Sequence, residues 1–257
     1  MSISILIPVY NEINTIRQCI TSVCEQNALD VLVLDDCSTD GTSEILQELG
    51  KVYSNLNIVR YPIKSQNYLL SIIENMHRLQ GTHVISLGAD DLLLPNIISN
   101  CEKHFDAPII FHNYYHIDSH DNIVLSQNMG VSGIQNLTSQ QVCDKFNSIP
   151  IRECGIGSCI RYDCLKWLIQ LKFWELGAWC DSIGYGAVAA KYGALYIPEF
   201  GAKFRISFRN GKVSYSQQSL SNQQVKSSTV NLSLDFLNRA GIDSQTSNSL
   251  IANWGLT

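Results

Sequence analysis

Two pairs of neighbouring carboxylates are the residues of this 257-residue sequence whose chemistry is easiest to interpret. Asp35 and Asp36, like Asp90 and Asp91, come at the end of a short apolar run with the length of a buried strand. Two such pairs at one edge of a sheet repel each other unless a cation or hydrogen-bond donors neutralise them. Because Mg²⁺ and Mn²⁺ prefer oxygen ligands, the pairs predict a site for a diphosphate held with a divalent cation.

The elements that must position these carboxylates alternate regularly along the first hundred residues. Apolar runs of strand length occur at residues 2–9, 31–34, 56–59 and 84–87. Apolar residues with helical spacing follow each run, at residues 16–24, 42–50, 69–79 and 97–105. This order predicts a mostly parallel sheet with helices on both faces. The carboxyl ends of its strands then meet at one edge, where folds of this kind bind ligands.

Some of the polar residues after these strands also have an ordinary structural explanation. A single Asp at the end of a strand is commonly a helix cap or a turn residue, and we expect this of Asp40. Asn11 or Asn14 is expected to cap the first helix, and Pro95 to stand in the first turn of the fourth. A functional role is predicted for the four carboxylates as a set, because they converge.

The regular alternation ends after residue 106. Strands are expected at residues 109–116 and 123–125, and a helix at residues 182–192. Residues 214–233 are rich in Ser and Gln, which predicts a mobile segment or an exposed arm. A short amphipathic helix is expected at residues 232–237.

Composition excludes several classes of protein. Lys and Arg total 18 against 23 Asp and Glu, without basic runs, which excludes nucleic-acid binding driven by phosphate neutralisation. No apolar run approaches the ~20 residues of a membrane helix, and no signal peptide is expected because the N-terminus lacks a basic segment. The nine cysteines form no C-x-x-C pair, which favours buried thiols in a reducing cytoplasm.

Three segments of the sequence resemble the family 2 glycosyltransferases of the GT-A fold. They are ILIPVYNE at residues 5–12, VLVLDDCSTDGT at 31–42 and HVISLGADDLLLPN at 83–96. The resemblance covers the first hundred residues closely and extends more loosely to about residue 210. It implies an α/β, GT-A-type fold: a Rossmann-like, mostly parallel sheet flanked by helices, with a smaller acceptor-side region and a C-terminal arm.

The resemblance also implies where a nucleotide sugar binds. Pro8, Val9 and Tyr10 are expected to line the pocket for the base, and Glu12 and Asp36 to hydrogen-bond the nucleoside. The third segment corresponds to the family's metal-binding motif.

In that motif, Asp90 is expected to face the ribose or the sugar, and Asp91 to coordinate a Mn²⁺ or Mg²⁺ ion that bridges the diphosphate. The catalytic base of the family stands at the start of a helix in the second half, where Asp181 matches it. An acidic residue often precedes the family's base, whereas Cys180 stands here. Asp181 could also be an ordinary helix cap, and Glu175 and Glu153 are the alternative bases.

Basic and aromatic residues stand at further places that a donor could reach. Arg60 and Lys64 follow the third strand and could contact a phosphate or be ordinary surface charges. The segment 204–212 resembles the family loop that closes over the diphosphate, although the family's histidine is missing. Its basic residues are Arg205, Arg209 and Lys212. Trp174 and Trp179 could stack on a sugar ring, although core packing is expected for at least one of them.

The resemblance implies an inverting, metal-dependent glycosyltransferase of the hexosyltransferase type that uses a nucleotide-diphosphate sugar, expected to be a UDP-sugar. The acceptor is expected to be a glycan or a lipid-linked molecule in the synthesis of a surface polysaccharide or glycoconjugate. The sequence lacks the Q-x-x-R-W motif and the membrane spans of processive members, so transfer of one sugar per encounter is expected. A cytoplasmic enzyme with a lipid-linked acceptor could make peripheral contact with the inner face of the membrane.

Three parts of the chain are expected on this reading. Residues 1–106 form the nucleotide-sugar-binding half, and residues 107–213 the acceptor-binding and catalytic half of the same domain. Residues 214–257 form a C-terminal arm or helix for membrane docking or dimer contacts.

Two other classes of protein are alternatives. A phosphoacceptor receiver domain also has an early Asp pair, but it needs an Asp after the third strand, where Arg60 and Pro62 flank Tyr61. A non-catalytic protein with the same fold, acting as a binding or scaffold module, stays open because of Cys180. The donor sugar, the linkage and the oligomeric state also stay open.

Overall fold

Strand β1 (Ile3–Val9) lies at the centre of the parallel half of the sheet in the computed structural model. The structure describes residues 2–26, 28–65, 68–128, 132–148, 157–206 and 223–253. Ile5 pairs with Val31 on one side and with Ile85 on the other, in parallel register on both. Helices cover both faces of this strand, so its apolar residues form a continuous run and do not alternate with polar ones.

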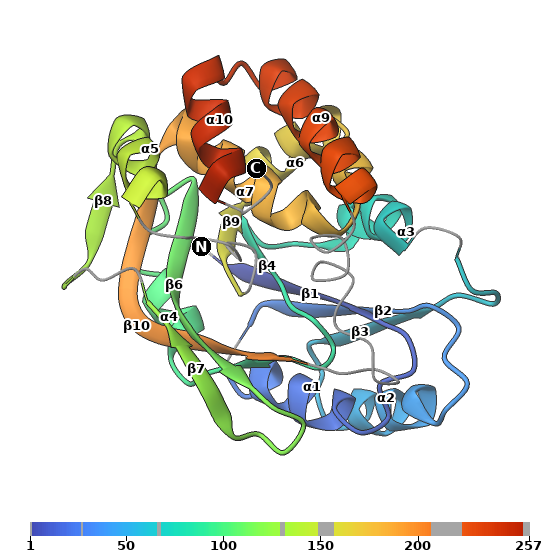
Figure 1. The fold of residues 1–257 in the computed structure, drawn as a ribbon. Coiled ribbons are helices and arrows are strands. Elements are labelled where there is room, and N and C mark those ends of the chain that lie inside the picture. Colours follow the sequence, from blue (N-terminus) through green and yellow to red (C-terminus); the bar gives the residue numbers. More distant parts are fainter. Residues whose placement is uncertain are drawn as a thin grey trace.

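The described residues form one curled sheet of ten strands, in the order β3-β2-β1-β4-β9-β6-β10-β5 (Figure 1). Strand β7 extends the sheet beside β6, and β8 pairs with β10. The strands other than β1 are β2 (Asp30–Asp35), β3 (Leu56–Arg60), β4 (His83–Ser86), β5 (Leu92–Leu93), β6 (Ile109–Ile117), β7 (Ile123–Gln127), β8 (Gln135–Leu137), β9 (Cys159–Arg161) and β10 (Ala194–Arg205). Strands β3, β2, β1 and β4 are parallel, as are β6 and β10, and β9 joins the two groups in antiparallel pairing. The predicted α/β fold class with a mostly parallel sheet is confirmed.

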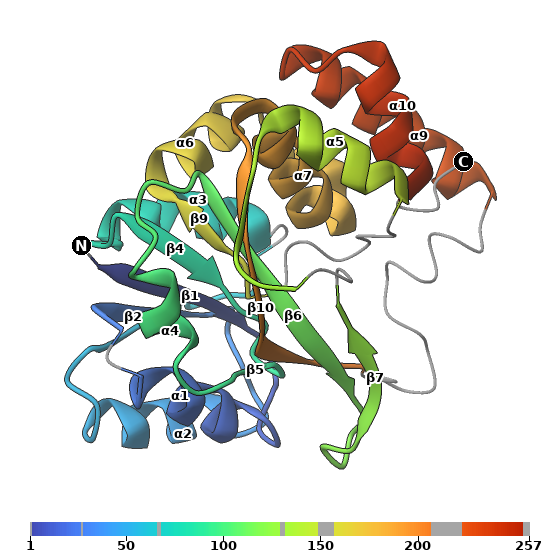
Figure 2. The same cartoon turned by 90° about the vertical axis from the view of Figure 1, so that its left-hand side faces the viewer.

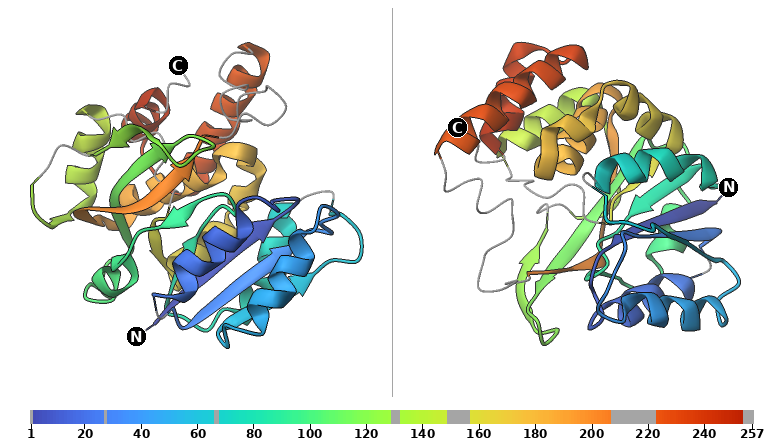
Figure 3. Two further views of the ribbon diagram at one scale, coloured as in Figure 1. Left: turned by 90° about the horizontal axis from the view of Figure 1, so that it is seen from below. Right: turned by 90° about the vertical axis from the view of Figure 1, so that its right-hand side faces the viewer.

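Helices divide between the two faces of the sheet. The helices and 3₁₀ turns are α1 (Ile16–Cys24), α2 (Thr42–Gly50), α3 (Tyr68–Asn75), η1 (Met76–Arg78), α4 (Ile97–Cys101), α5 (Ser139–Ser148), α6 (Tyr162–Gln170), η2 (Phe173–Trp179), α7 (Cys180–Tyr192), α9 (Gln223–Arg239) and α10 (Ser244–Asn253). The core on one face is built with α1, α2 and α4, and α1 and α2 lie side by side against the parallel strands (Figure 3). The other core gathers residues of η1, α5, α6, η2, α7, α9 and α10. Figure 2 shows α9 and α10 at the side of the molecule away from α1 and α2.

The four strands and four helices expected in the first hundred residues are present, with some differences at their ends. The first helix begins after Thr15 as its N-cap, so neither Asn11 nor Asn14 caps it. Pro95 precedes the N-cap Asn96 of α4 and does not enter its first turn. Helix α4 ends at Cys101, four residues earlier than expected.

The second half of the sheet includes a long strand, β10, that the sequence pattern does not predict. Residues 109–116 and 123–125 are strands β6 and β7 as expected, and residues 182–192 lie in helix α7. Strand β10 contains Pro198 and Gly201, and its pairing with β6 shifts register between Ile197 and Phe200 and again between Phe200 and Ala202. Because proline and glycine interrupt the period of a strand, the pattern of this segment does not predict a long one.

The C-terminal helices pack on the molecule more closely than the composition suggests. Helix α9 begins at Gln223, so the prediction of a mobile segment or arm is wrong for residues 223–233, while residues 214–222 lie outside the described part. Phe236 and Leu237 of α9 and Leu250 of α10 are fully buried in the core that contains α6 and α7. No helix in the described ranges is long and apolar enough to cross a membrane. The division into three parts stays a prediction.

The burial of α9 leads to a prediction about stability. Replacing Phe236, which has no exposed surface, with alanine is expected to lower the free energy of unfolding by about 3–5 kcal/mol, because it leaves a cavity. Leu232→Ala on the exposed side of the same helix is the matched control, with an expected change within about 0.5 kcal/mol. Urea unfolding measures both. Equal, small effects of the two changes would show that α9 does not belong to the core.

Candidate functional site

The loops after β1, β2 and β4 surround a cavity of about 440 Å³ at the carboxyl edge of the sheet. We call it the first cavity. Six of the residues expected to bind a donor line it, namely Pro8, Val9, Tyr10, Glu12, Asp36 and Asp90. The backbone N–H of Asp36 donates to the carbonyl of Val9 (2.9 Å), which ties the end of β2 to the end of β1. The structure therefore brings together residues that are far apart in the sequence, while their roles stay a prediction.

The carboxylates of Asp35 and Asp36 have different surroundings. Asp35 is fully buried and stabilises the turn that follows it, because its Oδ1 accepts the N–H of Ser38 (2.9 Å) and its Oδ2 the hydroxyl of Ser43. Arg60 Nε lies 3.7 Å from the same carboxylate. Asp36 instead lines the first cavity, where its Oδ1 accepts the N–H of Ser65 (2.7 Å).

The basic residues after β3 also differ in their surroundings. Arg60 donates to the carbonyl of Ser38 (3.1 Å) in addition to its contact with Asp35, so its guanidinium holds the turn after β2. Lys64 lines the first cavity, with its Nζ 3.4 Å from the ring centroid of Tyr10. Such an ammonium beside an aromatic face is a favourable cation–π contact.

Two lining residues of the first cavity were not expected from the sequence. Tyr61 and Ser71 lie on its wall, and the Tyr61 hydroxyl donates to the carbonyl of Ser71 (3.2 Å). Asn75 donates to the Tyr61 hydroxyl in turn (2.5 Å). Tyr61 follows β3 at the same sheet edge as the other residues, so its position after a strand is the signal that could have found it.

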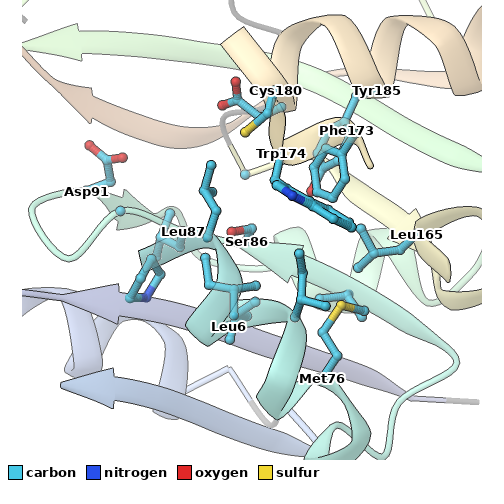
Figure 4. Close-up of a pocket in the computed structure, with 18 of the residues that line it drawn as sticks. Leu6, Met76, Ser86, Leu87, Asp91, Leu165, Phe173, Trp174, Cys180 and Tyr185 are labelled. Atoms are coloured by element: carbon cyan, nitrogen blue, oxygen red, sulfur yellow. The ribbon is translucent and has the colours of Figure 1, made fainter. Parts of the chain in front are cut away.

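A second cavity of about 300 Å³ opens beside the first (Figure 4). Pro8, Gly88 and Asp90 line both cavities, so the Asp90 loop is their common wall. Asp91 and Asp181 line the second cavity. The structure thus brings the predicted base to the same space as the predicted metal-binding carboxylates.

Asp181 lies in the first turn of α7, as expected. The N–H of Ser182 donates to its Oδ1 (2.7 Å), the contact of a carboxylate at a helix start. Gly177 has φ +62°, a conformation that favours glycine, and it puts a kink inside η2, three residues before α7 begins at Cys180. Burial raises the pKa of Asp181 above its usual value.

The Asp90 and Asp91 carboxylates crowd against one glycine. A Cβ at Gly88 would lie 2.6 Å from Asp91 Oδ2 and 3.1 Å from Asp90 Oδ1, so a side chain does not fit between them. Burial raises the pKa of Asp90, and burial together with the charge of Asp90 raises the pKa of Asp91 well above its usual value.

A divalent cation fits this arrangement. Two neighbouring carboxylates of raised pKa offer hard oxygen ligands, and a bound cation would relieve their mutual repulsion. Within the described ranges no group of three or more His, Cys, Asp or Glu side chains could hold a metal ion. The remaining ligands would therefore come from water and a bound phosphate ester.

Arg205 at the end of β10 holds the loop that carries these carboxylates. Its backbone N–H donates to Asp91 Oδ1 (2.9 Å), and its Nε donates to the carbonyl of Asp90 (2.9 Å). One terminal nitrogen donates to the carbonyl of Asp118 (2.9 Å), and the other pairs with Asp121 (2.6 Å). The side chain is 6% exposed. In this structure the Arg205 guanidinium is therefore used within the protein, and closure of the segment 204–212 over a diphosphate stays a prediction.

The remaining predicted residues, taken together with two buried histidines of β6, fall into three groups. Trp174 lines the second cavity, whereas Glu175 lines neither cavity and pairs with Arg239 (3.5 Å). His112 and His116 are buried, and both ring nitrogens of His112 contact backbone carbonyls. Outside the described part lie Glu153, Arg209, Lys212 and the side chain of Trp179.

Comparison with known proteins identifies a family. Residues 4–176 match the family described as Glycosyl transferase family 2. This segment is more than half of the chain and contains β1 to β9, the loops around the first cavity and the Asp90 loop.

Two curated proteins illustrate the relationship. The chain is 30% identical over 191 residues to a chondroitin synthase of Escherichia coli, an alignment that covers 68% of this chain and 27% of that protein. It is 32% identical over 91 residues to the putative teichuronic acid biosynthesis glycosyltransferase TuaG of Bacillus subtilis, covering 35% of this chain and 36% of TuaG. The alignments span well under half the length of either relative.

Solved structures share the fold. TarS 1-349 of S. aureus in complex with UDP-GlcNAc matches with a TM-score of 0.71 at 14% identity, covering 99% of this chain and 71% of that one. A mannosyltransferase of Pyrobaculum calidifontis in complex with GDP-Man and Mn2+ matches with a TM-score of 0.63 at 16% identity, covering 99% and 69%. These matches confirm the expected GT-A-type fold.

The buried position of Arg205 leads to a prediction. Arg205→Gln is expected to lower the free energy of unfolding by about 2 kcal/mol, because it removes a buried guanidinium that bonds the carbonyls of Asp90 and Asp118 and pairs with Asp121. The control is Arg161→Gln, whose ion pair with Asp163 is more exposed and is expected to contribute about 1 kcal/mol or less. Chemical denaturation compares the two variants, and equal losses would contradict the assigned role.

Proposed function

The chain belongs to glycosyl transferase family 2, and on that premise we propose that it transfers a sugar, with inversion, from a nucleotide-diphosphate donor, a UDP-sugar, to an acceptor hydroxyl. The observation that carries the proposal is the junction of the two cavities at Asp90, with Asp36 in one and Asp181 in the other. The complex of TarS with UDP-GlcNAc supports a UDP-sugar as the donor. The names of the curated relatives support a role in polysaccharide or glycoconjugate synthesis.

The nucleoside would bind in the first cavity. Pro8, Val9 and Tyr10 form the wall against which a base can pack, and the carboxylates of Glu12 and Asp36 can accept hydrogen bonds from the base and the ribose. Lys64 stands beside Tyr10 as a cation that could approach the donor. Asp90, which lines both cavities, would then lie between the nucleoside and the sugar.

A Mn²⁺ or Mg²⁺ ion would be held by Asp91, with Asp90 beside it. When bound, the ion supplies Lewis-acid stabilisation of the negative charge on the diphosphate. The N–H of Arg205 donates to Asp91 Oδ1, and this contact fixes the carboxylate that would hold the ion. Arg205 in this proposal orients the ligand and does not touch the donor.

Asp181 would act as the general base. Its carboxylate takes the proton of the acceptor hydroxyl as that oxygen bonds to C1 of the sugar. The bond from C1 to the phosphate oxygen breaks, and its electron pair leaves with UDP. Attack from the face opposite the leaving group inverts the anomeric centre. A base with a raised pKa accepts a proton more readily, which suits this task.

The place of the reaction in the cell is part of the proposal. Nucleotide sugars are used in the cytoplasm, where the free cysteines of the described ranges are stable as thiols. A lipid-linked acceptor would bring the enzyme to the inner face of the membrane as a peripheral protein.

Nucleotide binding tests the donor site. Calorimetric titration of UDP is expected to show binding that Mn²⁺ strengthens at least tenfold, and GDP is expected to bind more weakly. Asp91→Ala is expected to remove the effect of Mn²⁺, because the variant lacks the metal-binding carboxylate. Asp144→Ala, on the exposed side of α5, is the control and is expected to bind UDP like the unaltered protein. Failure of both nucleotides to bind would favour a scaffold protein over an enzyme.

The general base is tested by kinetics. Asp181→Asn is expected to lower kcat by about 10²–10⁴ with an unchanged Kd for UDP, because an amide cannot accept the proton. Glu175→Gln, the alternative base, is expected to keep full activity. Asp181 must be ionised to act and burial raises its pKa, so activity is expected to fall, as pH is lowered, at a higher pH than an ordinary aspartate would give. A kcat that survives in Asp181→Asn and is lost in Glu175→Gln would transfer the role to Glu175.

A further inference from the structure

The second cavity has an unusual lining for a space that receives sugars. Asp90, Asp91 and Asp181 are among its lining residues, and in Figure 4 Asp91 and Cys180, the neighbour of Asp181, lie toward one side of the cavity and Met76 and Leu165 toward the other. The wall between them is formed by hydrocarbon and aromatic side chains. They include Leu6, Leu69, Leu87, Phe173, Trp174 and Phe204.

The few polar groups along that wall leave it uncharged and mostly apolar. Burial raises the pKa of the Cys180 thiol and of the Tyr185 phenol, so both stay uncharged at neutral pH. Ser86 adds one hydroxyl. A sugar ring placed at this end would leave most of its hydroxyls without partners, which is unfavourable in a buried site. This lining favours the binding of an apolar group, because binding removes apolar surface from water.

The walls come from elements that are far apart in the sequence. Leu6 lies on β1, Leu69 and Ile73 on α3, and Leu165 on α6. Most of these residues belong to or pack against the core on that face, so the cavity extends from the reaction centre into hydrophobic surroundings. A cavity of about 150 Å³ lined by such residues stays dry and binds benzene, and this one has about twice that volume.

We infer that the second cavity binds the hydrocarbon part of the acceptor, so that the acceptor is a lipid-linked molecule whose reacting hydroxyl lies within a few bonds of an aliphatic chain. This inference rests on the proposed function, because Asp181 and Asp90 mark the end at which the hydroxyl must lie. The chain would extend from that end toward Met76 and Leu165. A cavity with carboxylates among its lining on one side and hydrocarbon side chains on the other fits a molecule with one polar end and one hydrocarbon end.

The test uses the n-alkanols from 1-butanol to 1-octanol, each a hydroxyl on an aliphatic chain, titrated by calorimetry in the presence of UDP and Mn²⁺. The Kd is expected to fall about fourfold with each added methylene until the cavity is full, the factor for burying one such group. A Kd that does not change with chain length would overturn the inference. Tighter binding of 2-phenylethanol than of 1-octanol would overturn the assignment to an aliphatic chain.

Two variants of α3 separate the cavity from other apolar surface. Ile73 lines the cavity and is half-buried, and Ile73→Ser is expected to weaken 1-octanol binding about fivefold. Leu70 is 44% exposed on the same helix and does not line the cavity, so Leu70→Ser is expected to bind 1-octanol normally. Equal behaviour of the two variants would overturn the inference.

The same samples distinguish a failure of the inferred acceptor class from a failure of the proposed function. Both variants are expected to bind UDP with unchanged affinity, because neither residue lines the first cavity. Binding of UDP without a dependence on chain length would leave the proposed function standing and refute the acceptor class. Absence of UDP binding to the unaltered protein would refute the proposed function itself.

Discussion

The position of buried Asp91 next to half-buried Asp90 is the constraint on which the rest of the site depends. The two carboxylates are held against Gly88 and repel each other, and their pKa values are raised by burial and, for Asp91, by the charge of Asp90. The protein offsets this repulsion with Arg205, which bonds the backbone of Asp90 and the side chain of Asp91. A cation and a diphosphate would complete the neutralisation. Arg205 keeps this loop in place before any ligand binds.

This loop also divides the space at the edge of the sheet into two environments. On one side the first cavity is bordered by Asp36, Lys64 and Tyr10, which combine charge with an aromatic face. On the other side the second cavity passes from Asp181 into the apolar core. A donor and an acceptor of different polarity could thus approach Asp90 from opposite sides. The separation follows from topology, because β1 and β4 are neighbours whose carboxyl ends open onto both spaces.

Helix α7 connects the second half of the chain to this arrangement. Gly177 kinks η2 shortly before α7 begins at Cys180, with a backbone conformation that favours glycine, and Asp181 lies in the first turn of α7. Residues of α7 are packed in one core with residues of α9 and α10. The C-terminal helices therefore support the element that carries the proposed base, although they lie away from the parallel strands.

The sequence by itself determined the first four strands, the helices between them and the residues at their ends. It could do so because β1, β2 and β4 are covered on both faces, which leaves mostly apolar runs, and because parallel strands must end at one edge. It could not separate Asp35 from Asp36 in structural terms, since only the folded turn shows that Asp35 bonds Ser38 and Ser43. Tertiary structure decided strand β10 and the use of Arg205 within the protein. The pairing of β10 with β6 and the contacts of the Arg205 guanidinium join residues more than eighty positions apart. Tertiary structure also decides the apolar lining of the second cavity, because its walls come from α3, α6, η2 and the sheet. No local sequence pattern predicts which side chains meet there.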